Sequence, residues 1–347
     1  MHARVKTAKA LFLVAIMILM SQVTYFSNNP VDDLDNSVLD EIQFADTGDA
    51  VLFDLGGAHA CSVGQSGNMK CWGNGTTGQL GLGNTQNVGD SAAEVGEGLP
   101  FVDIGSGLSV ESLALADSYS CALFTNGSVK CWGQVGLLGL GYAEQVDGFG
   151  DGYMEVGDVL PFLSFPSSRN ATMIEAGVAH TCAVIENGDL ICWGRNNKGQ
   201  LGLGNTSLIG DSADEVGENF ATVSLPTSRT VSQLALGTDH TCAIWDDGTV
   251  SCWGGNEYGQ LGYGNTDDIG DGGSEMGDNL NFVSLPNGDG ARNITAGNGF
   301  TCVILDNAGQ DVYCWGRNTV GQLGIESTDW VGANSSDMGN NMVETDL

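Results

Sequence analysis

LALGTDHTCAIWDDGTVSCWGGNEYGQLGYGNT, residues 234–266, is the stretch of this sequence that decides the fold. It contains two short β-type runs, HTCAI (240–244) and TVSCWG (249–254), separated by Asp246, Asp247 and Gly248. Short strands joined by a three-residue loop with a glycine are typical of a β-hairpin, in which the glycine takes the left-handed position of a bulge. The stretch therefore predicts a hairpin, and the flanking runs LALG and FVSLP (282–286) supply two more candidate strands.

The same pattern returns five times along the chain. The ten cysteines fall into five pairs whose first members are separated by steps of 60, 61, 60 and 60 residues, and Trp-Gly follows the second cysteine of every pair. Four short strands per unit, repeated around an axis, are the plan of a β-propeller, whereas a stacked solenoid usually has shorter units and distinct caps. The sequence therefore predicts an all-β protein, a β-propeller of about five blades with four-stranded blades and a repeat of about 60 residues.

The end of the chain supplies a candidate closing strand. With two extra residues allowed in the last hairpin, residues 345–347 align with residues 283–285 and with residues 102–104. The first unit, which starts near Val51, lacks a strand of this kind. Closing a ring of blades removes free sheet edges. We therefore expect the C-terminal strand to complete the first blade and close the propeller.

The repeat resembles the regulator of chromosome condensation repeat family. The resemblance covers about residues 51–347 and rests on the motifs G-x-x-H-T-C-A, C-W-G-x-N and G-Q-L-G, which stand at residues 177–183, 192–196 and 199–202. It implies a β-propeller, usually of seven blades, whose members serve as platforms for protein interaction. One branch of the family drives nucleotide exchange on a small GTPase at chromatin. This chain has five units, an export signal and an acidic composition, so we do not carry over the chromatin and exchange roles.

The two cysteines of each pair stand symmetrically about the hairpin turn. Residues opposed in an antiparallel pair have Cα atoms ~4.5–5.5 Å apart, which lies within the disulfide range. Zinc is the alternative, but it needs closely spaced C-x₂₋₄-C ligands, which this sequence lacks. An even number of regularly spaced cysteines in an exported chain predicts disulfides within the blades. The predicted pairs are Cys61 with Cys71, Cys121 with Cys131, Cys182 with Cys192, Cys242 with Cys252, and Cys302 with Cys314.

The first residues have the layout of an export signal. Three basic residues precede an apolar run from Ala10 to Met20, which is shorter than the ~20 residues of a spanning helix. No clean Ala-x-Ala cleavage site follows, so an uncleaved membrane anchor is the alternative. We assign residues 1–26 to a signal peptide or N-terminal membrane anchor, residues 27–50 to an acidic linker and residues 51–347 to the propeller. We expect the propeller to be secreted or held at the cell surface.

The charge balance restricts the partners. Lysine and arginine number 11 against 43 aspartates and glutamates, for a formal net charge of -32. Nucleic-acid affinity depends on cationic side chains that displace condensed counterions, so DNA and RNA are not expected partners. Anionic membrane surfaces are disfavoured for the same reason, which leaves an N-terminal anchor as the route to a membrane. Cations, basic proteins or simple solubility in salty surroundings are better interpretations of this charge.

Each unit carries an acidic loop after its G-Q-L-G-like segment, with the pattern G-D-x-x-x-E in four of the five units. Clustered carboxylates with nearby glycine and asparagine carbonyls are what Ca²⁺ prefers, since the ion takes six to eight oxygen ligands. The alternative is a solvated turn whose side chains bond their own backbone. The loops predict calcium as a candidate ligand, and no other cofactor is expected. The candidate ligands are Asp90, Glu94, Asp151, Glu155, Asp211, Glu215, Asp271 and Glu275.

One repeat position holds histidine in three units and another aromatic residue in the other two. The residues are His59, His180 and His240, with Tyr119 and Phe300. A position that accepts phenylalanine cannot depend on an imidazole for metal binding or proton transfer. We therefore expect a ring packed near the base of the hairpin.

The tryptophan that follows each second cysteine is predicted to pack between neighbouring sheets. A role in stacking against a ligand is the alternative. Trp245 and Trp330 stand outside the Trp-Gly motif and are better candidates for exposed contacts.

The departures from the repeat are the candidates for recognition. Segment 142–153 holds Tyr142, Phe149 and Tyr153 among acidic residues, and aromatic residues in a variable loop are typical contact residues. No Ser/His/Asp, Cys/His or phosphate-loop constellation is present, and an acid repeated in every blade builds a scaffold rather than a single active site. We predict an extracellular binding propeller without catalysis, whose blade-tip loops recognise a protein or glycan. The alternatives are a propeller hydrolase or lyase and a structural cell-surface component.

Overall fold

The computed structural model describes residues 50–142, 149–152 and 155–345. The chain divides into two units, Met1–Gln43 and Phe44–Leu347, and all described residues belong to the second. The predicted signal or anchor, nearly all of the predicted linker, and Tyr153 lie outside the described residues, so these assignments stay predictions. In the described part of the chain, no helix is both long enough and apolar enough to cross a membrane.

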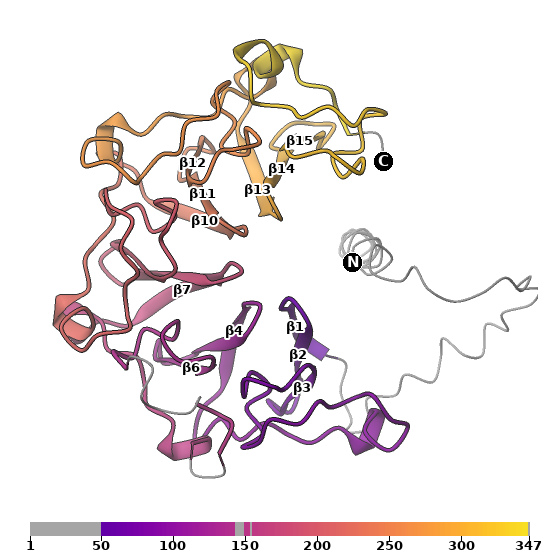
Figure 1. The fold of residues 1–347 in the computed structure, drawn as a ribbon, viewed down its shortest axis with the longest axis vertical. Helices are drawn as coiled ribbons and strands as arrows, with labels where there is room; N and C mark the ends of the chain where they lie inside the picture. The colour runs from indigo at the N-terminus through magenta and orange to yellow at the C-terminus, as the bar shows by residue number, and fades with distance from the viewer. Residues whose placement is uncertain (1–49, 143–148, 153–154, 346–347) are drawn as a thin grey trace, which may run out of the picture. The chain divides into compact units, whose positions relative to one another are not determined.

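Fifteen strands form five antiparallel sheets of three strands each, and in every sheet the strands lie in chain order (Figure 1). The first three sheets are β1 (Ala50–Leu55), β2 (His59–Gly64) and β3 (Met69–Gly73); β4 (Val110–Leu115), β5 (Tyr119–Phe124) and β6 (Val129–Gly133); and β7 (Ala171–Ala176), β8 (His180–Ile185) and β9 (Leu190–Gly194). The last two are β10 (Val231–Leu236), β11 (His240–Trp245) and β12 (Val250–Gly254); and β13 (Ala291–Ala296), β14 (Phe300–Leu305) and β15 (Val312–Gly316).

Short 3-10 helices lie in the segments that follow the third strand of each sheet. They are η1 (Gly96–Gly98), η2 (Gly157–Val159), η3 (Pro166–Ser168), η4 (Gly217–Asn219), η5 (Gly277–Asn279), η6 (Pro286–Gly288), η7 (Ser335–Asp337) and η8 (Gly339–Asn341). Each sheet with its connecting segment is one blade, so the predicted all-β class and count of five blades agree with the structure.

The hairpin predicted from the opening stretch is present as β11 and β12. Gly248 has φ +83°, the left-handed conformation that the bulged turn requires. The register sets Cys242 opposite Cys252, with Cα atoms 4.0 Å apart, and the two form a disulfide.

The other four predicted cysteine pairs are bonded in the same way, each across its own hairpin. Their Cα atoms all lie 4.1 Å apart, slightly closer than the range expected for opposed residues, and no free cysteine is found among the described residues. The predicted disulfide framework is therefore correct. These bonds join Cys61 to Cys71, Cys121 to Cys131, Cys182 to Cys192, and Cys302 to Cys314.

The prediction of a fourth strand in each blade is wrong. The segment around Val283 is not a strand, and it joins its sheet through one backbone hydrogen bond, from Val283 N to Val250 O at 2.8 Å. The corresponding bond in the first blade runs from Val102 N to Met69 O at 2.9 Å. The segment after each hairpin thus joins the edge of its own sheet through a single backbone bond. The first blade already has such a segment, so it leaves no gap for the C-terminal strand.

The predicted closure by the C-terminal strand is also wrong in its pairing. Thr345 N donates to Val312 O at 2.9 Å, and Glu344 bridges Tyr313, so this segment completes the fifth blade. Thr345 does correspond to Val283 and Val102, because all three donate the same kind of backbone bond, but each donates it to the sheet of its own blade. Residues 346 and 347 lie outside the described part.

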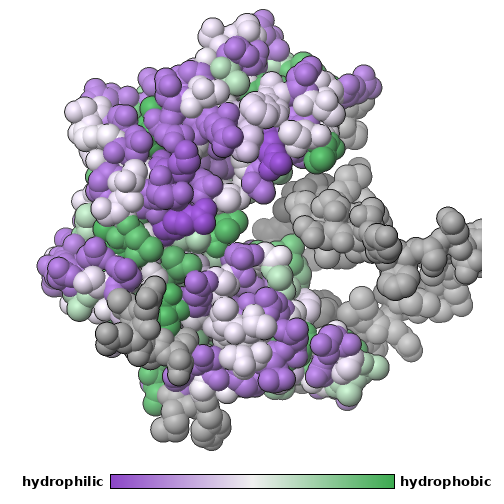
Figure 2. All heavy atoms as spheres, viewed as in Figure 1, coloured by the Kyte–Doolittle hydropathy of each residue, from purple (hydrophilic) through white to green (hydrophobic). Residues whose placement is uncertain are grey.

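Consecutive sheets pack against each other through their first strands: β1 contacts β4, β4 contacts β7, β7 contacts β10 and β10 contacts β13. Four hydrophobic clusters lie between these neighbours, each with residues from two consecutive blades. The face seen in Figure 2 is mostly hydrophilic, with a hydrophobic strip near β7. The core of this unit therefore sits between blades.

Candidate functional site

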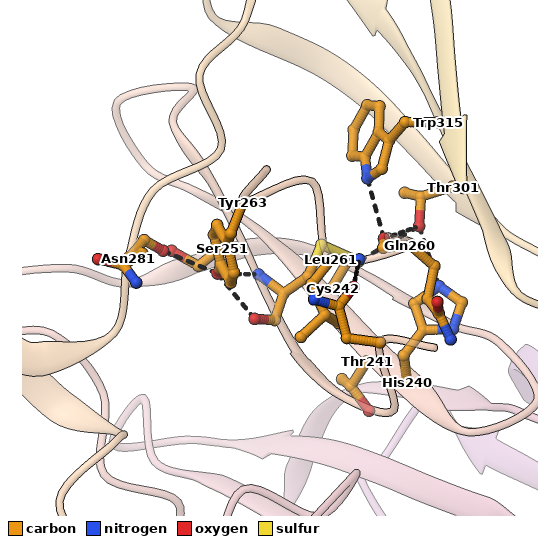
Figure 3. Close-up of a disulfide and its surroundings, with 12 residues drawn as sticks. His240, Thr241, Cys242, Ser251, Gln260, Leu261, Tyr263, Asn281, Thr301 and Trp315 are labelled. Carbon is orange, nitrogen blue, oxygen red and sulfur yellow. Dashed lines mark hydrogen bonds between the residues drawn. A yellow bond between two sulfur atoms is a disulfide. The ribbon is translucent and has the colours of Figure 1, made fainter. Parts of the chain in front are cut away.

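A main-chain carbonyl lies at the centre of the junction between the fourth and fifth blades. Gln260 O accepts two hydrogen bonds from the next blade, one from Thr301 Oγ1 and one from Trp315 Nε1, both at 2.9 Å (Figure 3). The indole lies directly on Gly262, where an added Cβ would stand 2.8 Å from Trp315 Nε1. The G-Q-L-G motif is thus a seat for the next tryptophan, and its glycine is required by this close approach.

The histidine of this junction has a defined tautomer. His240 Nε2 lies 2.9 Å from Thr301 Oγ1, whose single hydroxyl proton is already donated to Gln260 O. The imidazole must therefore carry its proton on Nε2 and donate to the hydroxyl oxygen. Its other nitrogen, Nδ1, is buried without a hydrogen-bond partner among the described residues. Tyr119 stands at the same position, and its hydroxyl shares a hydrogen bond of 2.8 Å with Thr181 Oγ1 in which either group can be the donor.

Burial keeps these imidazoles neutral. Desolvation lowers the pKa of His59 and His240 to about 4 and that of His180 to about 3. A proton on Nδ1 would place a charge in a site with no acceptor, which is the physical cause of the shift. The rings pack at the hairpin base as expected, and in addition they join one blade to the next.

We expect the substitution His240→Phe to change the acid sensitivity of the fold. A histidine with a pKa of 6.5 when unfolded and about 4 when folded gives stability that is present above pH 6.5 and is lost as the pH falls. This group alone should lose on the order of 3 kcal/mol between pH 7 and pH 4. In urea titrations the variant should be less stable at pH 7, with a deficit that shrinks towards pH 4. A deficit independent of pH would contradict this account.

The blade tryptophans are structural. Trp132, Trp193, Trp253 and Trp315 are fully or almost fully buried, whereas Trp72 in the first blade is half-buried. The prediction that Trp245 makes exposed contacts is wrong, because its ring is buried and its Nε1 donates to Ser251 Oγ at 3.0 Å. Trp330 is 42% exposed, as expected.

The glutamates of the acidic loops accept hydrogen bonds from backbone N–H groups of their own loops. Glu275 Oε2 accepts backbone hydrogen bonds from Gly270 N and Gly272 N, both at 2.8 Å, and Glu215 Oε2 accepts one from Gly210 N at 3.1 Å. Glu94 and Glu155 make equivalent bonds. Within the described ranges, no group of three or more His, Cys, Asp or Glu side chains is arranged to hold a metal ion. These contacts match the turn-forming alternative, and calcium binding stays a prediction.

A second acid of the loop ties the second, third and fourth blades each to the preceding one. Asp278 Oδ1 accepts a hydrogen bond from Thr227 N at 2.6 Å, and Asp158 Oδ1 accepts one from Ser106 N at 2.7 Å. These bonds lower the pKa of both carboxyl groups, so both stay ionised to lower pH than an ordinary aspartate. Much of the acidic repeat is therefore used to build the scaffold.

The structure brings together two of the three predicted contact residues. Tyr142 is 48% exposed, and its ring centroid lies 5.7 Å from that of Phe149. Phe149 bridges Gly133 and packs against the core on both sides of its blade, so it has a structural role. Tyr142 therefore remains a candidate contact on this loop.

Two carboxyl groups, Asp54 on β1 and Glu175 on β7, stand at a position of the first strand where the other three blades have no acid. Burial raises the pKa of Asp54 to about 6 and that of Glu175 to about 8, and repulsion from Asp54 adds to the second shift. A raised carboxyl pKa is also what a general acid requires. Asp54 Oδ2, however, accepts a hydrogen bond from Leu115 N at 2.8 Å and joins the first blade to the second. Asp54 therefore has a use in the scaffold.

An aromatic cluster with one exposed ring, Trp330, lies on the fourth and fifth blades. Tyr258 and Trp330 meet edge to face with ring centroids 4.9 Å apart, and the Arg317 guanidinium lies 5.3 Å from the centre of the Tyr258 ring. In the preceding pair of blades these two aromatic positions hold Lys198 and Asp268, which form an ion pair at 3.0 Å. An aromatic pair has thus replaced an ion pair at one place in the repeat.

The segment before Trp330 departs from the repeat as well. Glu326 has φ +54°, where the other units have glycine. A non-glycine residue in this conformation costs about 1–2 kcal/mol, and such outliers gather at binding sites. Glu326 and Asp329 help to line an open pocket of about 550 Å³. The remaining lining residues are Gly321, Ser327 and Thr328. We call Tyr258, Arg317, Glu326, Asp329 and Trp330 the Trp330 surface.

Comparison with known families accounts for the repeated part of this geometry. The model of the regulator of chromosome condensation (RCC1) repeat matches residues 187–244, and a second model of the same repeat matches residues 231–260 and 291–322. The matched segments include Gln260 and the tryptophans Trp193, Trp253 and Trp315. Residues 187–260 and 291–322 thus match RCC1 repeats.

Known RCC1-repeat proteins match most of this chain. The ultraviolet-B receptor UVR8 of Arabidopsis thaliana is 28% identical over 279 residues, which cover 79% of this chain and 54% of UVR8. The guanine nucleotide exchange factor SRM1 of Saccharomyces cerevisiae is 26% identical, over 79% of this chain and 58% of SRM1. The chain therefore spans little more than half the length of these relatives.

A solved structure supports the fold assignment. The chain is similar to yeast RCC1 (Prp20) in its crystal structure with Kap60, with a TM-score of 0.59 and 22% identity, over 84% of this chain and 62% of that one. The repeat thus accounts for the blades and their junctions. The Trp330 surface and Tyr142 are not part of the repeated pattern.

Proposed function

We propose that this protein is an extracellular binding propeller whose Trp330 surface recognises a basic segment of a partner protein. The observation that carries the proposal is the exposed Trp330 ring against the half-buried Tyr258, beside two acids, at a place where the preceding blades have an ion pair. The repeated histidines, tryptophans and cysteines are engaged in junctions and disulfides. Tyr258 and Trp330 belong to neither of these sets.

The charge around the cluster favours a cationic partner. An arginine or lysine over an indole face gains about 0.5–2 kcal/mol, and nearby carboxylates add to the attraction. Glu326 and Asp329 stand close to Trp330 in the chain, and the whole protein has a formal net charge of -32. A uniformly acidic molecule also attracts a basic partner over long range. The cation–π contact, the nearby carboxylates and the long-range attraction together favour a basic protein segment over nucleic acid as the partner.

An oxidising environment is supported by the cysteines. Five disulfides join all ten cysteines of the chain, and such bonds persist in secreted or surface-exposed proteins. The relatives named above include a receptor and an exchange factor, and yeast RCC1 is solved in complex with Kap60. These names favour a protein partner over a glycan, and a binding role over catalysis.

The proposal is tested with the oxidised chain and a library of immobilised peptides of varied charge. We expect basic peptides to be retained, and the substitution Trp330→Ala to weaken the best of them by about 5- to 30-fold, because it removes the cation–π contact. Tyr142→Ala is the matched control, since Tyr142 is also aromatic and about equally exposed. Both variants should keep the wild-type melting temperature.

The two variants also separate the alternatives. If binding is lost on Tyr142→Ala and kept on Trp330→Ala, the recognition surface is the loop at residues 142–153. If no basic peptide is retained, the proposal is refuted and a structural role at the cell surface gains support.

A further inference from the structure

The four junctions between neighbouring blades share one polar pattern. A histidine or tyrosine of one blade bonds a serine or threonine hydroxyl of the next, and in three junctions that hydroxyl donates to the carbonyl of the seat. The bonds between ring and hydroxyl are His59–Ser120 at 2.7 Å, Tyr119–Thr181 at 2.8 Å, and His180–Thr241 and His240–Thr301 at 2.9 Å. The ring always comes from the earlier blade and the hydroxyl from the later one.

Both members of this pair are missing at the two ends of the series. The fifth blade carries Phe300 at the ring position, which cannot donate a hydrogen bond. The first blade carries Ala60 at the hydroxyl position, which cannot accept one. Loss of one partner alone would leave a buried polar group unpaired, which destabilises a contact. Loss of both together leaves an apolar ring and a methyl group that fit each other.

The first blade exposes the surface that later blades bury. Phe53 is 53% exposed, whereas its counterparts in the other four blades are buried. Leu55 is 37% exposed, and Trp72 is half-buried. These side chains flank Ala60 in the sheet, since Leu55 and Trp72 pair with Ala60 on its two sides. We call Phe53, Leu55, Ala60 and Trp72 the leading face.

The fifth blade exposes the complementary surface. Phe300, Ile304 and Val312 are half-buried, although the residues at these positions in the first four blades are buried. The seat of this blade is present in the sequence as residues 321–324, with the carbonyl of Gln322 in the position of Gln260. Among the described residues, neither this carbonyl nor Trp72 Nε1 has a hydrogen bond. We call Phe300, Ile304, Val312 and Gln322 the trailing face.

We propose that the leading face of one copy of this protein docks on the trailing face of a second copy, as a sixth blade would follow the fifth. Phe300 then packs on Ala60 of the second copy, Ile304 and Val312 cover Phe53, and Trp72 Nε1 donates to Gln322 O. The occupant is a second copy because the two faces match each other and both are partly exposed. On the leading face Ala60 itself is buried, whereas Phe53 and Leu55 around it are exposed. On the trailing face Phe300, Ile304 and Val312 are half-buried. The proposal does not involve the Trp330 surface.

The contact joins unlike faces, so it is a head-to-tail contact that leaves one face of each kind free in a dimer. Contacts of this class extend into open chains unless the rotation between copies closes a ring. The mass of the oxidised chain should therefore rise with concentration beyond a dimer. A mass that stays monomeric up to the highest concentration tested would overturn the proposal and favour closure of the fifth blade on the first.

Two charge substitutions test the direction of the contact. Leu55→Arg places a charge on the leading face and Ile304→Arg places one on the trailing face, and each should abolish self-association in sedimentation velocity. Mixed in equal amounts they should form a dimer and nothing larger, because each variant supplies the face that the other lacks. A misfolded variant could not restore that dimer, so the mixture also controls for folding.

Other outcomes decide against the head-to-tail contact. If the mixture stays monomeric while the wild type associates, the copies meet through another surface. If the wild type is monomeric and each variant melts at a lower temperature, the two faces meet within one chain. Trp330→Ala should leave the mass unchanged at every concentration, because Trp330 belongs to neither face.

Discussion

Reduction of the five disulfides should unfold this protein at neutral pH and room temperature. Each bond closes a loop with a sequence separation of 10 or 12 residues. Chain entropy gives about 2–3 kcal/mol for a loop of this length, so five such bonds contribute on the order of 10–15 kcal/mol. Native domains are stable by about 5–15 kcal/mol in total, so little stability should remain. The measurement is tryptophan fluorescence against urea, with and without reductant.

A comparison between blades tests whether packing adds to this effect. Replacing Cys182 and Cys192 by alanine empties a site in the third blade that is fully buried between two neighbours. Replacing Cys302 and Cys314 alters the trailing edge of the fifth blade, where Cys302 is half-buried. We expect the first double variant to lose more stability, by about 1–2 kcal/mol, because it also leaves a cavity. A reduced chain with an unchanged urea midpoint would show that the sheets alone hold the fold.

The sequence predicts the local parts of this structure well. The turn at Gly248 and the disulfide between Cys242 and Cys252 depend on residues within one hairpin, whose spacing fixes the register. The burial of Trp253 could also be predicted, because a large apolar ring at a fixed place in every unit must pack between units. Information that lies within one repeat is sufficient for these features.

The errors arise where a segment has a choice between partners. The run around Val283 alternates as a strand does, but a single backbone bond joins it to its sheet, and periodicity cannot count such bonds. Alignment places Thr345 at the position of Val283 but does not tell which sheet accepts its bond, and the bond goes to the fifth blade. Trp245 stands where Phe124 packs in the second blade, and the single tryptophan at that position hides the correspondence.

The junction network could have been found from the sequence. The pair His-Thr in H-T-C recurs in the third and fourth units, and the first and last units lose the hydroxyl and the histidine respectively, at Ala60 and Phe300. A correlated loss at the two ends indicates a contact from one unit to the next. The partner of Trp330 could not have been found in this way, because Tyr258 lies in another blade and only the fold brings the two rings together.

The substitution Trp253→Ala should destabilise the fold by about 3–5 kcal/mol, because it removes a fully buried indole and leaves a cavity between two blades. It also removes the hydrogen bond from Trp253 Nε1 to Gln200 O, at 3.1 Å. Trp330→Ala is the control, since an exposed side chain should change stability by no more than about 0.5 kcal/mol. Equal effects of the two substitutions would contradict a structural role for the blade tryptophans. The measurement is the free energy of unfolding in urea.

A matched pair of substitutions isolates the hydrogen bond. Trp193 is as buried as Trp253, but its Nε1 has no partner among the described residues, because the preceding unit has a shortened loop in place of the glutamine seat. Trp193→Phe and Trp253→Phe remove similar volumes, so their difference reports the bond to Gln200 O. We expect Trp253→Phe to cost about 1 kcal/mol more. If the two costs are equal, the seat acts through shape alone, and the glycine of G-Q-L-G, rather than its neighbouring carbonyl, is what joins each blade to the next.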